Sequence, residues 1–112
     1  MSYTLVASPV FKLSLQRLIY FLEKKYTQSL ANKTKRTIRK GIEKGLLINP
    51  KVAPISPRLI ELGINEYRQL LVDKHNLVFF RIDEANKRVI LLAVMDSRQS
   101  IGKLLSEINL LV

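Results

Sequence analysis

The apolar run Val89–Met95, which reads Val-Ile-Leu-Leu-Ala-Val-Met, places the strongest constraint on the fold. Successive side chains of a strand point to opposite faces, so a strand of this composition is apolar on both sides. We expect one face to rest on helices and the other to have a second cover. The C-terminal segment and a partner protein are equal candidates for that cover, and a partner-covered face would mark a binding surface.

Upstream of this run, the sequence predicts a strand followed by two helices. Residues Tyr3–Ala7 alternate weakly, as in a short strand. Ser8-Pro9 is typical of a helix start, with serine as N-cap and proline at the first helical position. Apolar residues then recur at helical spacing as far as Tyr26. After a break at residues 27–29, a second helix begins at Leu30 and is ended by Asn49-Pro50, which completes an antiparallel hairpin.

Downstream, a proline-containing loop over residues 50–65 leads into three strands. The predicted strands are Glu66–Val72, Leu77–Asp83 and Arg88–Met95, and a polar turn at residues 84–87 suits a hairpin between the last two. Residues 100–112 predict a short C-terminal helix. We therefore expect one α+β domain over residues 1–112: an N-terminal strand, a helical hairpin on one face of a mainly antiparallel sheet of about four strands, and a short C-terminal helix.

The charge balance favours an anionic partner. The chain of 112 residues carries 19 Lys and Arg against 9 Asp and Glu, a net charge of +10, which suits nucleic acid or an acidic protein segment. A basic protein that binds nothing in particular is the alternative.

Several classes of site and location are disfavoured. Cysteine is absent, which excludes disulfides and zinc–thiolate sites. His75 is the one histidine, so we expect no metal and no cofactor; a turn or edge role suits it better than that of a lone general base. No run reaches the roughly 18 apolar residues of a membrane helix, and the N-terminus lacks a secretory layout, so we expect no membrane partner and a cytoplasmic location.

Three segments resemble the C-terminal half of RelE/ParE toxins. They are Tyr67–Val72, His75–Asp83 and Val89–Gln99, and the order of the upstream strand and basic hairpin also agrees. The resemblance implies the toxin component of a bacterial type II toxin–antitoxin module of the plasmid-stabilisation (addiction) kind. It also implies a cognate antitoxin that is short, acidic and partly disordered.

Two activities exist among such toxins, and the residues distinguish them. RelE-like members cut messenger RNA in the ribosomal A site, whereas ParE-like members inhibit DNA gyrase. Arg68 and Arg98 match basic positions of the nuclease pattern. Leu70 and Asn76 stand where further basic residues are expected, and the C-terminal tyrosine has no counterpart at residues 101–104. The resemblance is therefore nearer ParE, with growth arrest through gyrase and no bond-making residue.

The candidate site residues follow from charge and resemblance. For partner binding they are Arg68, Arg98 and the helix bases Lys33, Lys35, Arg36, Arg39 and Lys40. The alternative for the helix is a solvated face, and for Arg98 a salt bridge with Asp96 or Glu107. A ribosome-dependent endoribonuclease would use Arg68, Lys74, Arg81 and Arg98 for phosphate contact, and a non-toxic basic binding module is a third hypothesis.

Overall fold

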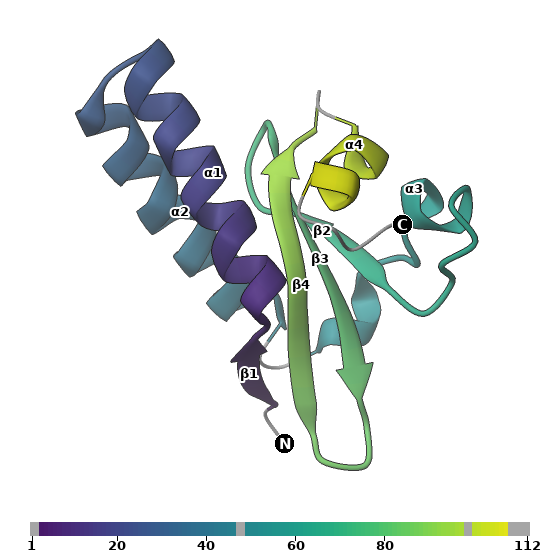
Figure 1. Ribbon diagram of the computed structural model, residues 1–112. Helices are drawn as coiled ribbons and strands as arrows, with labels where there is room; N and C mark the ends of the chain where they lie inside the picture. Colours follow the sequence, from purple (N-terminus) through teal and green to yellow (C-terminus); the bar gives the residue numbers. More distant parts are fainter. Residues whose placement is uncertain (1–2, 47–48, 98–99, 108–112) are drawn as a thin grey trace.

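The computed structural model describes residues 3–46, 49–97 and 100–107. The elements follow the predicted order, and the predicted α+β class is confirmed (Figure 1). They are β1 (Thr4–Ala7), α1 (Pro9–Lys25), α2 (Gln28–Leu46), the 3₁₀ turn η1 (Pro50–Val52), α3 (Pro57–Ile60), β2 (Arg68–Leu71), β3 (Asn76–Asp83), β4 (Arg88–Asp96) and α4 (Ile101–Glu107).

The four strands form one mixed sheet in the order β1-β4-β3-β2. The pairs β2–β3 and β3–β4 are antiparallel, as tight connections require. β1 returns after the helical hairpin and pairs in parallel with the first half of β4, from Thr4 opposite Arg88 to Ala7 opposite Leu91. The apolar strand β4 therefore lies inside the sheet, between β1 and β3.

Both faces of β4 are covered within the chain. On one face, Val89, Leu91 and Val94 pack in a core cluster with residues of α1 and α2. On the other, Leu92 and Met95 belong to a second cluster that includes Leu59 of α3 and Leu104 of α4. Figure 1 shows the hairpin on one side of β4, with α3 and α4 on the other. The second face of β4 is therefore covered by α3 and by α4 of the C-terminal segment.

A register shift between β3 and β4 determines which β4 side chains face each cluster. Phe79 pairs with Ala93 and Phe80 with Leu91, so Leu92 is an extra residue on the β4 side. Such a bulge turns the following side chains without ending the strand. Leu92 consequently joins Ala93 in the cluster under α3 and α4.

Two serines of the helical segment cover the edge of β4 where β1 ends. The Ser8 hydroxyl caps α1 by accepting from Phe11 N at 3.0 Å, and it donates to the Leu92 carbonyl at 3.3 Å. Ser14 is 1% exposed; its Oγ accepts from Val94 N at 3.0 Å and donates to the Phe11 carbonyl at 2.8 Å. Helix α1 thus continues the hydrogen bonding that β1 begins.

Several predicted boundaries differ from the structure: β2 ends at Leu71 and not Val72, β3 begins at Asn76 and not Leu77, and β4 ends at Asp96 and not Met95. Three further differences concern the helices, the loop and the start of β2. Helix α2 begins at Gln28 and not Leu30, because Thr27 Oγ1 accepts from Leu30 N at 3.0 Å and caps the first turn. The predicted loop over residues 50–65 contains η1 and α3, which Ser56 caps through Leu59 N. The third correction is that β2 begins at Arg68 and not Glu66. The predicted tail helix is present as α4, and residues 108–112 lie outside the described part.

Helix α2 approaches Val72, the residue that follows β2, very closely at Gly41. A Cβ at this position would lie 2.7 Å from Val72 Cβ, which is attached directly to the backbone. Any side chain there would have to push the helix away from the sheet. This glycine sets the depth at which the hairpin lies on the sheet.

The β3–β4 turn is held by a carboxylate. Asp83 accepts from Asn86 Nδ2 at 3.0 Å and from Arg88 Nη2 at 2.8 Å. These hydrogen bonds, that of Asn86 first, lower the pKa of Asp83 from 3.8 to about 2. Lys87 adopts a positive φ of 51°, which completes the reversal.

We expect Ser14→Ala to lower the free energy of unfolding by about 1–3 kcal/mol, because Val94 N loses its acceptor in the core. Urea denaturation measures the change. Ser29→Ala, at an exposed position in α2, is the matched control and should leave stability nearly unchanged. Equal stability of the two variants would show that the hydroxyl is dispensable.

The depressed pKa of Asp83 gives a pH dependence with a definite sign. The carboxylate contributes stability that is fully present above pH 3.8 and is lost as the pH falls toward 2. Carboxyl NMR titration of the folded chain should show a higher pKa of Asp83 in Asn86→Ala and in Arg88→Ala, with the larger rise in Asn86→Ala. An unchanged pKa in both variants would contradict this assignment.

Candidate functional site

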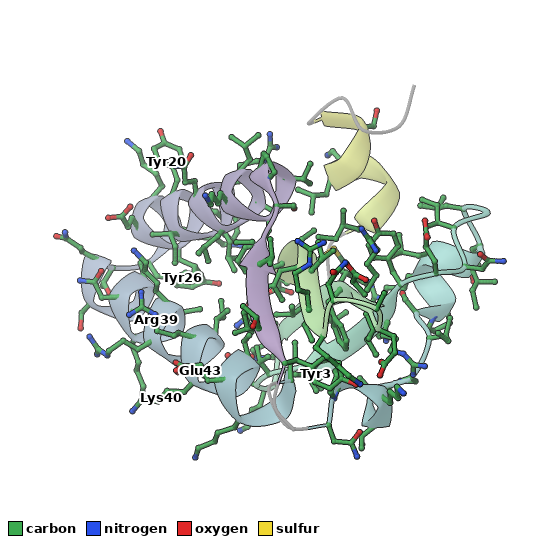
Figure 2. All side chains as sticks on the ribbon, turned by 90° about the horizontal axis from the view of Figure 1, so that it is seen from below. Tyr3, Tyr20, Tyr26, Arg39, Lys40 and Glu43 are labelled. Carbon is green, nitrogen blue, oxygen red and sulfur yellow. The ribbon has the colours of Figure 1, made fainter. Side chains whose placement is uncertain are left out.

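The bases predicted on the second helix lie exposed along α2. Lys33, Lys35, Arg36, Arg39 and Lys40 all have exposed side chains. Figure 2 shows Arg39, Lys40 and Glu43 along this helix. The five bases do not share one environment, since Lys35 and Arg39 border one groove and Lys33 another.

The first groove lies between β1, α1 and α2, and we call it the β1 groove. Its volume is about 640 Å³. Buried apolar side chains form the floor: Phe11 of α1, Ile38 and Ile42 of α2, and Leu91 of β4. Its lining also includes Tyr3, Lys35, Arg39 and Glu43. The β1 groove therefore combines an apolar floor with a rim that is more basic than acidic.

Strand β1 gives this groove a second feature. It is an edge strand of the sheet, and among the described residues only β4 pairs with it. An edge strand has backbone groups available for pairing with an added strand. The β1 groove thus lies beside backbone that an extended segment can use.

A polar cluster fixes the start of β1 at the end of the groove. Tyr3 Oη donates to Glu84 at 3.0 Å, Lys51 Nζ lies 3.4 Å from the same carboxylate, and Lys87 also pairs with it. The hydrogen bond from Lys87, followed by that from Tyr3, lowers the pKa of Glu84. The N-terminal strand is thereby tied to the β3–β4 turn.

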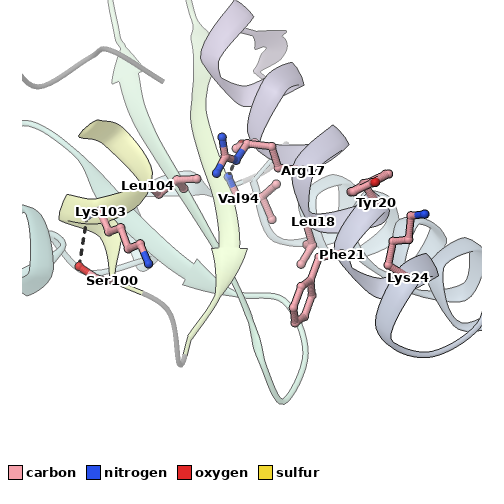
Figure 3. Close-up of a pocket in the computed structure, with 10 residues that line it drawn as sticks. Arg17, Leu18, Tyr20, Phe21, Lys24, Val94, Ser100, Lys103 and Leu104 are labelled. Carbon is pink, nitrogen blue, oxygen red and sulfur yellow. Dashed lines mark hydrogen bonds between the residues drawn. The ribbon is translucent and has the colours of Figure 1, made fainter. Parts of the chain in front are cut away.

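The second groove lies between α1 and α4, and we call it the α1–α4 groove (Figure 3). Its volume is about 790 Å³. Leu18, Val94 and Leu104 are buried lining residues. The other lining residues are Ser14, Arg17, Tyr20, Phe21, Lys24, Ser100 and Lys103. In Figure 2, Tyr20 projects from the side of α1 that faces away from α2, so the two grooves lie on different sides of this helix.

The third groove, of about 540 Å³, lies between the tip of the hairpin and the β2–β3 turn. Lys33, Lys74 and His75 line it together with Asp73 and Asp96. The Asp73 carboxylate accepts from the backbone N atoms of His75 and Asn76, both at 2.8 Å. His75 therefore lies in a turn, and the mixed charges of this groove favour no particular ligand.

The nuclease candidates do not converge in the described part of the chain. Arg68 Nη1 donates to the Ala53 carbonyl at 2.6 Å and to the Lys51 carbonyl at 3.2 Å, so it holds the loop that precedes α3. It shares the helix-facing side of the sheet with Leu70, two residues on. Arg81 shares the opposite face with Phe79. Arg98 lies outside the described residues.

Neither a metal centre nor a membrane span is found in the described ranges. No group of three His, Cys, Asp or Glu side chains gathers there in a way that could hold a metal ion. No helix in those ranges has the length and apolarity needed to cross a membrane.

Two solved structures share this fold. A chain of the chromosomal ParDE TA system from P. aeruginosa superimposes with a TM-score of 0.68 and 14% sequence identity, over 84% of this chain and 95% of that chain. A chain of the toxin–antitoxin complex RelBE2 from Mycobacterium tuberculosis gives a TM-score of 0.54 and 14% identity, over 86% and 99%. No protein-family model matches the sequence, and no curated protein matches it either.

The fold is that of the RelE/ParE toxin–antitoxin proteins, as the sequence resemblance predicts. Between the two structures, the superposition is better on the chain from the ParDE system.

The α1–α4 groove was not predicted from the sequence. A signal for it exists in α1, where Tyr20 and Phe21 lie three and four residues after Arg17 and four and three residues before Lys24. This spacing places basic and aromatic side chains on one helical face, next to the core-facing stripe. Lys103 lines the groove only because α4 packs beside α1, and the spacing of residues within α1 does not predict that packing.

We expect Arg68→Ala to lower the free energy of unfolding by about 1–3 kcal/mol, since two loop carbonyls lose a charged donor. Arg36→Ala, at an exposed position on α2, should change stability by no more than about 0.5 kcal/mol. Thermal and urea denaturation measure both changes. If Arg68→Ala were as stable as Arg36→Ala, the anchoring role of Arg68 would be refuted.

Proposed function

We propose that the chain is the growth-arresting toxin of a bacterial type II toxin–antitoxin module, that it inhibits DNA gyrase in the cytoplasm, and that a cognate antitoxin neutralises it. The observation that carries the toxin assignment is the fold shared with chains of the ParDE and RelBE2 systems. The basic surface of α2 is consistent with an acidic partner.

The choice of gyrase over RNA cleavage rests on the arginines. A ribosome-dependent endoribonuclease needs several basic groups around one phosphate. Arg68 is engaged with loop carbonyls, and Arg81 lies on the other face of the sheet. General acid–base assistance is worth on the order of 10²–10⁴-fold. Neither Arg68 nor Arg81 lines any of the three grooves described above, so neither shares them with His75 or the tyrosines.

We assign the antitoxin to the β1 groove. A segment with apolar residues on one side would cover Ile38, Ile42 and Leu91, and acidic residues on the other would meet Lys35 and Arg39. The unpaired edge of β1 lies alongside for an extended stretch of the same segment. A segment that folds on binding meets these requirements with a short sequence.

Induced expression of the chain should arrest growth, and the purified protein should inhibit gyrase in a supercoiling assay. Messages in a translation extract should remain intact under the same conditions. Truncated messages with normal supercoiling would instead establish the endoribonuclease. Normal growth after verified expression would leave a non-toxic basic binding module.

The antitoxin surface is tested by charge reversal. Lys35→Glu and Arg39→Glu should weaken rescue of growth by the product of the adjacent gene, while toxicity in its absence remains. Lys40→Glu is the matched control, because Lys40 is exposed on α2 outside the groove lining. Equal rescue of all three variants would place the antitoxin elsewhere.

A further inference from the structure

The α1–α4 groove carries basic groups on both of its sides. Arg17 and Lys24 come from α1, and Lys103 comes from α4 (Figure 3). Arg17 and Lys24 are seven residues apart, which corresponds to roughly 10 Å along a helix. None of the lining residues in the described part of the chain is acidic. A chain with repeated negative charges suits this arrangement better than a single small anion.

Two aromatic side chains lie between these basic groups. Tyr20 is 62% exposed and Phe21 is 40% exposed, whereas Phe11 and Leu18 of the same helix are buried in the core. Lys24 Nζ lies 5.5 Å from the centre of the Tyr20 ring. Exposed rings beside cations are the features with which proteins bind single-stranded nucleic acid, because bases stack on the rings while cations contact phosphates.

The comparison with the β1 groove narrows the class of ligand. The floor of the β1 groove is made of buried aliphatic and phenyl groups, which suit the apolar side of a peptide. In the α1–α4 groove, the exposed apolar surface lies largely on flat rings set between charges. In a nucleotide, a flat uncharged base can lie against such a ring while the neighbouring phosphate contacts a basic side chain.

We propose that the α1–α4 groove binds single-stranded nucleic acid. Tyr20 and Phe21 stack on bases, and Arg17, Lys24 and Lys103 contact the phosphates. The site is separate from the β1 groove and requires no cleavage of the bound strand. It does not rest on the proposed toxin function, since binding and growth arrest are measured independently.

The test is fluorescence anisotropy with labelled twelve-residue probes: oligothymidylate, oligouridylate and poly-glutamate. Both single strands should bind, and their relative affinities separate DNA from RNA as the source. With three phosphates neutralised, the logarithm of the affinity should fall with the logarithm of salt concentration with a slope of about −2. Equal binding of poly-glutamate, or tighter binding of a duplex of the same length, would overturn the proposal.

Substitutions in the groove distinguish the contribution of base stacking to the affinity from that of charge. Tyr20→Ala should weaken binding by roughly 5- to 150-fold, because a stacked base is worth about 1–3 kcal/mol, whereas Tyr20→Phe should bind nearly as the unaltered chain does. Lys103→Ala should reduce the salt slope by about 0.7.

Lys40→Ala removes one charge from α2 outside this groove and is the control for net charge. It should leave the salt slope unchanged and the affinity within about twofold, because Lys40 is exposed and does not line the groove, and salt screens its charge. Circular dichroism verifies that each variant is folded. If Tyr20→Ala bound as tightly as Lys40→Ala, the groove would not be the binding site and the proposal would fail.

Discussion

The arrangement of the molecule depends on how the edge of β4 is completed. This strand has nine residues, but β1 pairs with only four of them. The hydroxyl groups of Ser8 and Ser14 take over where β1 ends, and they bring α1 against the strand. A buried strand edge without such partners would leave backbone groups unsatisfied at a large cost. These two contacts, together with the packing of Phe11 and Leu18 in the core, hold α1 against β4.

Because α1 lies along this edge, it separates two grooves of different chemistry. Phe11 faces the β1 groove, where the floor is apolar and a strand edge lies near, and Tyr20 faces the α1–α4 groove, where rings alternate with cations. One helix therefore presents a surface suited to a peptide and another suited to a polyanion. Basic residues line both grooves, so charge alone does not identify the ligand of either.

The sequence predicts most of the fold because its local patterns agree with one another. The capping serine before Pro9, the helical spacing to Tyr26 and the apolar run Val89–Met95 each specify an element without knowledge of the rest. The site is predicted less well. Lys35 and Arg39 are found as members of a basic face, but which bases border a groove depends on how α2 lies on the sheet, a depth that Gly41 sets. The partners of Arg68 are carbonyls of an irregular loop, which no periodic pattern describes.

The parallel pairing of β1 with β4 has a consequence for biosynthesis. Residues 4–7 can find their partners only after residues 88–91 have been translated, so the first strand stays unpaired until the helical hairpin and two further strands have been made. The nascent chain can form its hairpin early, but contacts of such long sequence separation close late and slowly. The sheet and the two grooves beside α1 can therefore be completed only after β4 has been translated, because β4 lines both grooves. A ligand of either groove can therefore bind the folded domain but not the nascent chain before β4 is made.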